Sequence, residues 1–122
     1  MRALPLALAC SMLPTLVLAE AAPLDCVILA RCTFGEDCEE TEEEFLLEPT
    51  PTGYSASIDG DWVALARVSP DESEVQSFLL STANSITVLL SIYPDGAMAL
   101  TTHEDIGGRH VETGYGRCVE EI

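Results

Sequence analysis

Lysine is absent from this chain of 122 residues, in which five arginines face 21 aspartates and glutamates for a formal net charge of −16 at pH 7. A field of that sign repels the phosphates of nucleic acids and anionic membrane surfaces, and it attracts cationic molecules. The composition therefore excludes a nucleic-acid-binding function. It favours a cationic protein as partner, and solubility alone is the other interpretation of the charge.

The sequence also lacks the motifs of common enzymes, because it contains no His-Glu-x-x-His, no Gly-x-Ser-x-Gly and no phosphate loop. His103 stands beside Glu104 and Asp105, which is the pattern of a base with an orienting carboxylate. Neighbouring residues on a strand point to opposite faces, however, so His103 and Glu104 would not meet. His110 follows Arg109 at the start of an expected strand. We expect two surface histidines and a protein that is not an enzyme.

Cysteine spacing argues against metal and thiol chemistry. Three cysteines recur as Cys-x5-Cys-x5-Cys between residues 26 and 38, unlike the Cys-x2-Cys pairs of zinc sites. Redox enzymes also use closely spaced cysteine pairs, and none is present. The sequence therefore predicts no metal and no cofactor.

The N-terminal segment has the layout of a secretory signal peptide. One charge at Arg2 precedes an apolar run from residue 3 to 18, and small residues follow at Ala19 and Ala21. We expect a signal peptide of residues 1–19, with cleavage after residue 21 as an alternative, and a mature domain of residues 20–122. The predicted location is periplasmic or secreted.

The same apolar run makes a poor membrane anchor. Pro5 and Pro14 interrupt it, and a membrane span needs about 20 apolar residues. A lipid-anchored N-terminus at Cys10 is the alternative, but Ala7 stands where such sites carry leucine. We therefore expect no stable membrane insertion after cleavage.

Export places the remaining cysteines in an oxidising compartment, where they are expected to form two disulfides. Four cysteines allow three pairings, and we favour Cys26–Cys118 with Cys32–Cys38. The first bridge would enclose nearly the whole domain. In the chain-entropy model it stabilises the fold by about 4 to 5 kcal/mol, against about 2 kcal/mol for the short bridge.

Residues 36–44 form a dense acidic run in which seven of nine side chains are carboxylates. Such a run resists compact structure and predicts a solvated loop. It lacks the ligand spacing and central glycine of an EF-hand calcium loop. The remaining functional interpretation is docking on a basic partner through Glu36, Asp37, Glu39, Glu40, Glu42, Glu43 and Glu44.

Beyond the acidic run the chain is typical of a sheet, with short apolar segments separated by turn residues such as Asp59-Gly60 and Pro94-Asp95-Gly96. Other expected turns are 49–53, 83–84 and 104–108. The eight expected strands are Asp25–Cys32, Phe45–Glu48, Tyr54–Ile58, Trp62–Val68, Val75–Ser81, Ile86–Ile92, Ala97–His103 and Arg109–Cys118. They predict a single all-β domain, built as a small antiparallel up-and-down barrel or a sandwich.

The segment from residue 75 to 82 is open to two interpretations. Ser69-Pro70 followed by acidic residues resembles a helix start, and residues 75, 78, 79 and 82 would form a helical face. We favour a strand over 75–81, with one helical turn at 70–73.

Two arginines lie inside expected strands, Arg67 and Arg117. Either one could pair with the acidic run, which is a modest surface effect. An arginine that pointed into a barrel would instead mark a pocket for an anionic ligand. Trp62 and Tyr115 are expected in the core or in an interface, because aromatic side chains contribute large apolar area to small domains.

Several short motifs resemble those of a group of small exported four-cysteine bacterial proteins of unknown function. They are the three-cysteine block with its acidic run, Pro94-Asp95-Gly96-Ala97, Thr-x-His at 101–103 and Tyr115-Gly116-Arg117-Cys118. The resemblance implies a secreted four-cysteine β domain with a strand at 75–81, and it brings no activity or catalytic residue.

In size, compartment and charge sign the chain is also similar to the periplasmic lysozyme inhibitors, which are small disulfide-bonded β-barrels. Their Ser-Gly-x-x-Tyr inhibitory loop has no counterpart here. We expect a non-enzymatic binding or envelope-associated module, with an inhibitor-like protein docking on a cationic enzyme such as lysozyme as the alternative. A barrel that holds a small apolar ligand and a hydrolase with an unfamiliar site are the other hypotheses.

Overall fold

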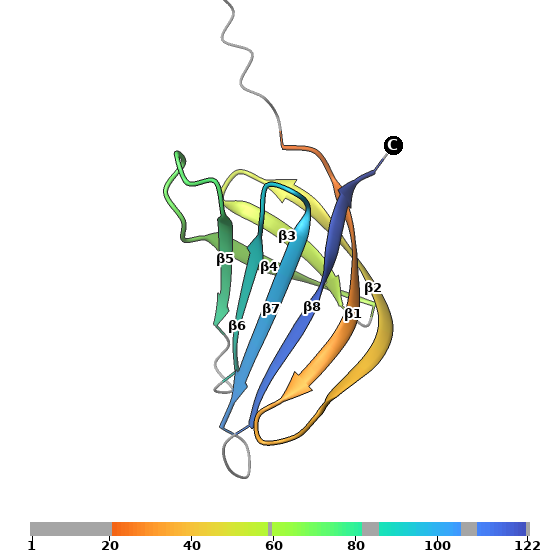
Figure 1. Ribbon diagram of the computed structural model, residues 1–122. Coiled ribbons are helices and arrows are strands. Elements are labelled where there is room, and N and C mark those ends of the chain that lie inside the picture. Colours follow the sequence, from red (N-terminus) through yellow and green to blue (C-terminus); the bar gives the residue numbers. More distant parts are fainter. Residues whose placement is uncertain (1–20, 59, 82–85, 106–109, 122) are drawn as a thin grey trace, which may run out of the picture.

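The computed structural model describes residues 21–58, 60–81, 86–105 and 110–121. The expected signal peptide lies outside these residues, as do the expected turn at 83–84 and much of the one at 104–108. The described chain forms eight strands in a closed antiparallel barrel in which each strand pairs with its sequence neighbours and β8 returns to β1 (Figure 1). This confirms the all-β up-and-down barrel expected from the sequence.

The strands are longer than the sequence suggested at several ends. Their bounds are β1 Leu24–Thr33, β2 Cys38–Thr50, β3 Gly53–Ile58, β4 Asp61–Arg67, β5 Gln76–Ser81, β6 Ile86–Ile92, β7 Ala97–Glu104 and β8 His110–Glu120. The expected strand at 75–81 is confirmed by β5. The expected helical turn before it is a single hydrogen-bonded turn, in which the Ser73 N–H donates to the Pro70 carbonyl at 3.0 Å. No helical segment of the described chain has the length and apolarity to cross a bilayer.

Two expected connections are in fact part of β2. Residues 38–44 of the acidic run were expected in a loop, but they belong to this strand, so that expectation is wrong. The run tolerates a strand because β1 pairs with it and its seven carboxylate residues all remain exposed. Pro49 and Thr50 also lie in β2 rather than in a turn. The pairing with β1 ends at Leu47, so the N–H that proline lacks is not needed there.

The core fills the barrel with one alternate face of every strand. Leu47 and Leu90 are fully buried, and the other buried apolar residues are Cys26, Ile28, Phe45, Tyr54, Ala56, Leu65, Phe78, Val88, Met98 and Cys118. Trp62 and Tyr115 do not belong to this core, because both lie on the outer face and are half exposed, at 51% and 50%. The core alternative is therefore wrong for both residues, since β4 and β8 turn other residues inward, and the interface alternative stays a prediction.

Two disulfides join Cys26 to Cys118 and Cys32 to Cys38, which is the pairing favoured by the sequence. The first links β1 to β8 and so crosses the closure of the barrel. The second spans the β1–β2 turn, where Cys32 and Cys38 are opposite each other. These bonds are consistent with an extracellular or periplasmic location.

The barrel has two distinct ends. We call the end with the β2–β3, β4–β5 and β6–β7 connections the mouth, and the end with the β1–β2 and β3–β4 turns the base (upper and lower in Figure 1). The start of β1 and the end of β8 meet at the mouth, where the Glu121 N–H donates to the Pro23 carbonyl at 3.0 Å. Each end therefore has its own turns, its own disulfide and, as shown below, its own inward-pointing arginine.

Candidate functional site

The acidic residues 36–44, which we call the acidic ribbon, form the turn between β1 and β2 and the first half of β2. The seven carboxylate residues are all exposed. The ribbon is anchored at its start by the Cys32–Cys38 disulfide and by the Glu36 N–H, which donates to the Thr33 carbonyl at 2.9 Å. It is therefore a shaped surface of negative charge on a strand, not a free loop.

Arg31 holds the ribbon to the barrel. It points inward at the base, where its guanidinium donates hydrogen bonds to both carboxylate oxygens of Glu43 on β2 and to Glu112 on β8. His110 adds a contact from its Nε2 to the other Glu112 oxygen at 3.4 Å. One arginine thus ties together three consecutive members of the barrel wall, β8, β1 and β2.

The electrostatics of this cluster follow from its hydrogen bonds. The bonds from Arg31 lower the pKa of the Glu43 carboxyl below its ordinary value, although partial burial acts in the opposite direction. The same bonds raise the pKa of Arg31, again against the effect of burial. The ionised Glu43 therefore stabilises the fold, and it is the one ribbon carboxylate that forms an ion pair within the described chain.

Arg31 is absent from the residues that the sequence singles out, and the expected pairing of Arg67 or Arg117 with the ribbon is wrong. Arg67 pairs with Asp71 at 3.5 Å, and no ion pair joins Arg117 to another described residue. A signal for Arg31 was present, since it directly precedes a tight turn and the antiparallel return of the chain brings acidic residues opposite it. The exact partner depends on the register shift between Ile28 and Ala30, which no sequence pattern indicated.

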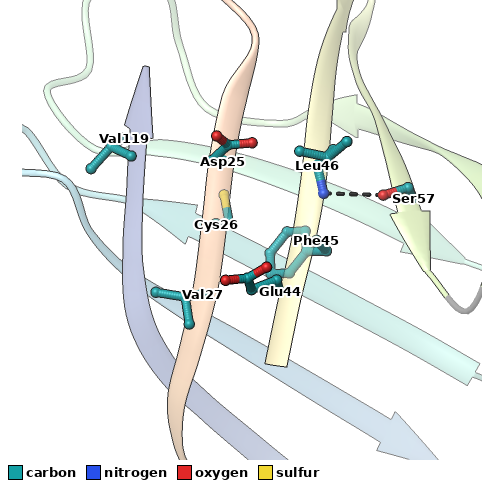
Figure 2. Close-up of a pocket in the computed structure, with 8 residues that line it drawn as sticks. All are labelled: Asp25, Cys26, Val27, Glu44, Phe45, Leu46, Ser57 and Val119. Carbon is teal, nitrogen blue, oxygen red and sulfur yellow. Dashed lines mark hydrogen bonds between the residues drawn. The ribbon is translucent and has the colours of Figure 1, made fainter. Parts of the chain in front are cut away.

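A groove lies on the outer wall beside the ribbon (Figure 2). Its apolar floor includes Val27, Leu46 and Val119, and the carboxylates of Asp25 and Glu44 flank that floor. The volume of the groove is about 440 Å³.

The groove forms where β2 and β3 separate, because their pairing stops at Leu47 and Ala56. In place of a ladder bond, the Leu46 N–H donates to the Ser57 hydroxyl at 3.1 Å, as the dashed line in Figure 2 shows. The wall of the barrel is therefore hollowed at this point, next to the acidic ribbon.

The mouth holds the second inward arginine. Leu65 on β4 is buried and Arg67, two residues on, shares its face and is paired with the buried Phe78 of β5. Arg67 therefore lies on the inner face at the rim of the mouth, where it remains exposed to solvent, whereas Arg117 is exposed on the outer wall, on the face away from the buried Cys118. The condition stated for an anionic-ligand pocket, an arginine that faces inward, is met by Arg67.

The histidines do not assemble with the carboxylates beside them in the sequence. His103 and Glu104 are successive residues of β7, so they face opposite sides, and His103 is exposed. His110 contacts Glu112 in the base cluster. Within the part of the chain that the structure describes, no three His, Cys, Asp or Glu side chains come together as a metal site.

Comparisons with known proteins returned no match: no family model fits the chain, no curated protein is similar to it, and no solved structure resembles its fold closely enough to be reported.

Proposed function

We propose that the protein is an exported, non-enzymatic binding module of the periplasm or extracellular space, and that it docks on a cationic protein through the acidic ribbon and the adjoining groove. The observation that carries the proposal is the placement of the ribbon carboxylates. They are exposed on an anchored strand, and within the described chain only Glu43 is neutralised by an ion pair. The others are available to a partner.

The groove supplies the short-range part of this recognition. A lysine or arginine side chain of the partner has an apolar stem and a charged tip. The stem fits the floor of Val27, Leu46 and Val119, and the tip fits between Asp25 and Glu44. Long-range attraction by the net charge would speed the encounter, and the groove would fix the register of the complex.

An inhibitor that covers a cationic enzyme such as lysozyme is one form of this function. The negative ribbon and the small size suit it, and it requires no catalytic group on this chain. Lysozyme is therefore a suitable probe for the docking surface, both as a cationic protein and as an enzyme whose activity reports on coverage of its cleft.

The test compares two triple variants that remove the same charge. The first, E40Q/E42Q/E44Q, neutralises the ribbon and the edge of the groove, and the control E72Q/E74Q/E121Q neutralises exposed acids elsewhere on the barrel. Binding to lysozyme is measured by surface plasmon resonance at low and high salt. We expect wild type to bind at low salt only, and the ribbon variant to bind at least about fivefold more weakly than the control.

Either of two results would contradict the proposal. Absence of binding at low salt would remove the docking function. Equal weakening by the two triple variants would show that net charge alone, and not the ribbon, attracts the probe. A further variant tests the same surface. Arg117 lies opposite Val27 on the outer wall, at the edge of the groove. R117Q removes a positive charge that would repel the cationic partner, so it should strengthen binding.

A further inference from the structure

The mouth contains a pocket of about 680 Å³ that the docking function does not use. That volume falls within the range of about 300 to 1,000 Å³ that is typical of small-molecule sites. Six of its lining side chains carry the argument, and they are Leu24, Tyr54, Arg67, Gln76, Phe78 and Ile92. Deeper in the barrel, Leu47 and Leu90 are fully buried, so core side chains fill the interior and the pocket remains at the end.

One side of this pocket is formed by packed aromatic side chains. Tyr54 and Phe78 are both buried, and their rings meet edge to face with centroids 5.0 Å apart. Gln76 is fixed by a hydrogen bond from its Nε2 to the Ser73 carbonyl at 2.5 Å. A ligand would therefore meet a preformed surface, which lowers the entropic cost of binding.

The guanidinium of Arg67 is held by only a weak ion pair in this pocket. Its one ion pair among the described residues is to Asp71 at 3.5 Å, and the Asp71 side chain is 93% exposed. An exposed pair of this kind contributes at most about 1 kcal/mol. A ligand anion could replace Asp71 at little cost, because Asp71 would return to water.

Arg67 also acts on the phenol of Tyr54. Burial raises the pKa of Tyr54, the charge of Arg67 works against that rise, and the charge of Glu120 adds a smaller rise. Tyr54 therefore remains a neutral hydroxyl that can donate a hydrogen bond, and it does so within the electrostatic reach of the guanidinium.

We propose that the mouth binds a small amphiphilic carboxylate, with its apolar body against Tyr54, Phe78 and Ile92 and its carboxylate on Arg67. The net charge of −16 opposes any anion at long range, so the apolar body must supply much of the affinity. Arg67 then selects the head group, because a carboxylate accepts two hydrogen bonds from a guanidinium. This site is at the end of the barrel opposite to the base and does not depend on the proposed docking function.

The test uses octanoate as the probe and isothermal titration calorimetry as the measurement. 1-Octanol carries the same apolar body without the charge, and acetate carries the charge without the body. We expect octanoate to bind at least about tenfold more tightly than octanol, and acetate not to bind measurably. Titration with octanoate at higher salt should not abolish binding, because salt also screens the repulsion by the other carboxylates.

Variants locate the site. R67M keeps an apolar side chain of similar length and should lower octanoate affinity to that of octanol, whereas R117M makes the same charge change on the outer wall and should leave it unchanged. D71N removes the competing carboxylate and should raise the affinity several-fold. Melting curves establish that each variant is folded.

Two outcomes would overturn the proposal: wild type that does not bind octanoate, or R67M and R117M that bind it equally. The ribbon variant E40Q/E42Q/E44Q should bind octanoate as wild type does. Failure of octanoate binding therefore leaves the docking function standing, and failure of docking leaves the mouth site standing.

Discussion

Each end of the barrel has one arginine on the inner face of the wall, but the two arginines differ in their ion-pair partners. At the base, Arg31 is bonded to two carboxylates from two different strands and its side chain is 30% exposed. At the mouth, the side chain of Arg67 is 34% exposed and has one ion-pair partner among the described residues, Asp71, which is almost fully exposed. Arg31 therefore helps to close the base of the barrel, whereas the charge of Arg67 at the mouth is largely available to a ligand.

This difference indicates which end is structural and which is adaptable. A partly buried arginine with two bonded carboxylates is costly to disturb, because removing it leaves two like charges close together. An arginine held by one solvated carboxylate can exchange its partner with little change in the fold. The distinction concerns the two arginines and not the disulfides, whose contributions to stability depend on the length of the loop that each one closes.

The largest difference between the ends is expected from their disulfides. C26A/C118A should lower the free energy of unfolding by about 4 to 5 kcal/mol, and C32A/C38A by about 2 kcal/mol, because the first bridge closes a much longer loop. The sequence separations are 92 and 6 residues. Urea unfolding followed by circular dichroism measures both.

Binding measurements on the same variants separate an effect on stability from an effect on binding. C32A/C38A frees the start of the acidic ribbon, so its lysozyme binding should weaken while its octanoate binding is retained. Equal stability losses for the two variants would contradict the chain-entropy account and would show that native packing around the sulfurs dominates instead.

Much of the fold could be predicted from the sequence because its signals are local. Alternation and turn residues identified the hairpin of β6 and β7, where Gly96 takes a φ of 88° and its N–H donates to the Tyr93 carbonyl at 2.9 Å. The favoured bridge between Cys26 and Cys118 joins the first expected strand to the last, in agreement with the closed barrel. These features depend on a few neighbouring residues or on one covalent bond.

The missed features depend on partners that are distant in the sequence. The charge run alone predicted a loop, but pairing with β1 makes residues 38–44 a strand. Both faces of β4 carry apolar residues, so the pattern could not show that Trp62 points outward and Arg67 inward. Arg31 reaches Glu112 across 81 positions of the chain, through a register that only the closed barrel defines.

The second prediction compares the two arginines directly. R31M should destabilise the fold by about 1 to 2 kcal/mol, which is less than the loss for a fully buried pair because Glu43 is half exposed and water screens it. R67M should change stability by no more than about 0.5 kcal/mol. Thermal and urea unfolding at neutral pH check both values.

A double variant shows whether the charge is the cause. If R31M is destabilising because it leaves two carboxylates unpaired, R31M/E43Q should recover part of the loss, since only Glu112 then remains ionised in the cluster. No recovery would mean that Arg31 acts through its packing. A large loss for R67M would contradict the contrast between the ends.

The smallest effect is the pH dependence of the base cluster, which the mouth should not share. Hydrogen bonds from Arg31 lower the pKa of Glu43 below its ordinary value of 4.5, so its ionised form stabilises the folded state. The unfolded chain binds the proton more readily, and the contribution of Glu43 is therefore full above pH 4.5 and is lost as the pH falls through the lowered pKa. The stability gap between wild type and E43Q should be no more than about 1 kcal/mol at about pH 7, because the side chain is half exposed, and it should narrow steadily as the pH falls below 4.5. E42Q is the matched control: its carboxylate has no ion pair with a described residue and sits among like charges, so its loss should stabilise slightly at neutral pH. Unfolding curves for the three proteins across this range measure these differences. A gap for E43Q that is constant with pH would show that ionisation of Glu43 is not the source of its contribution to stability.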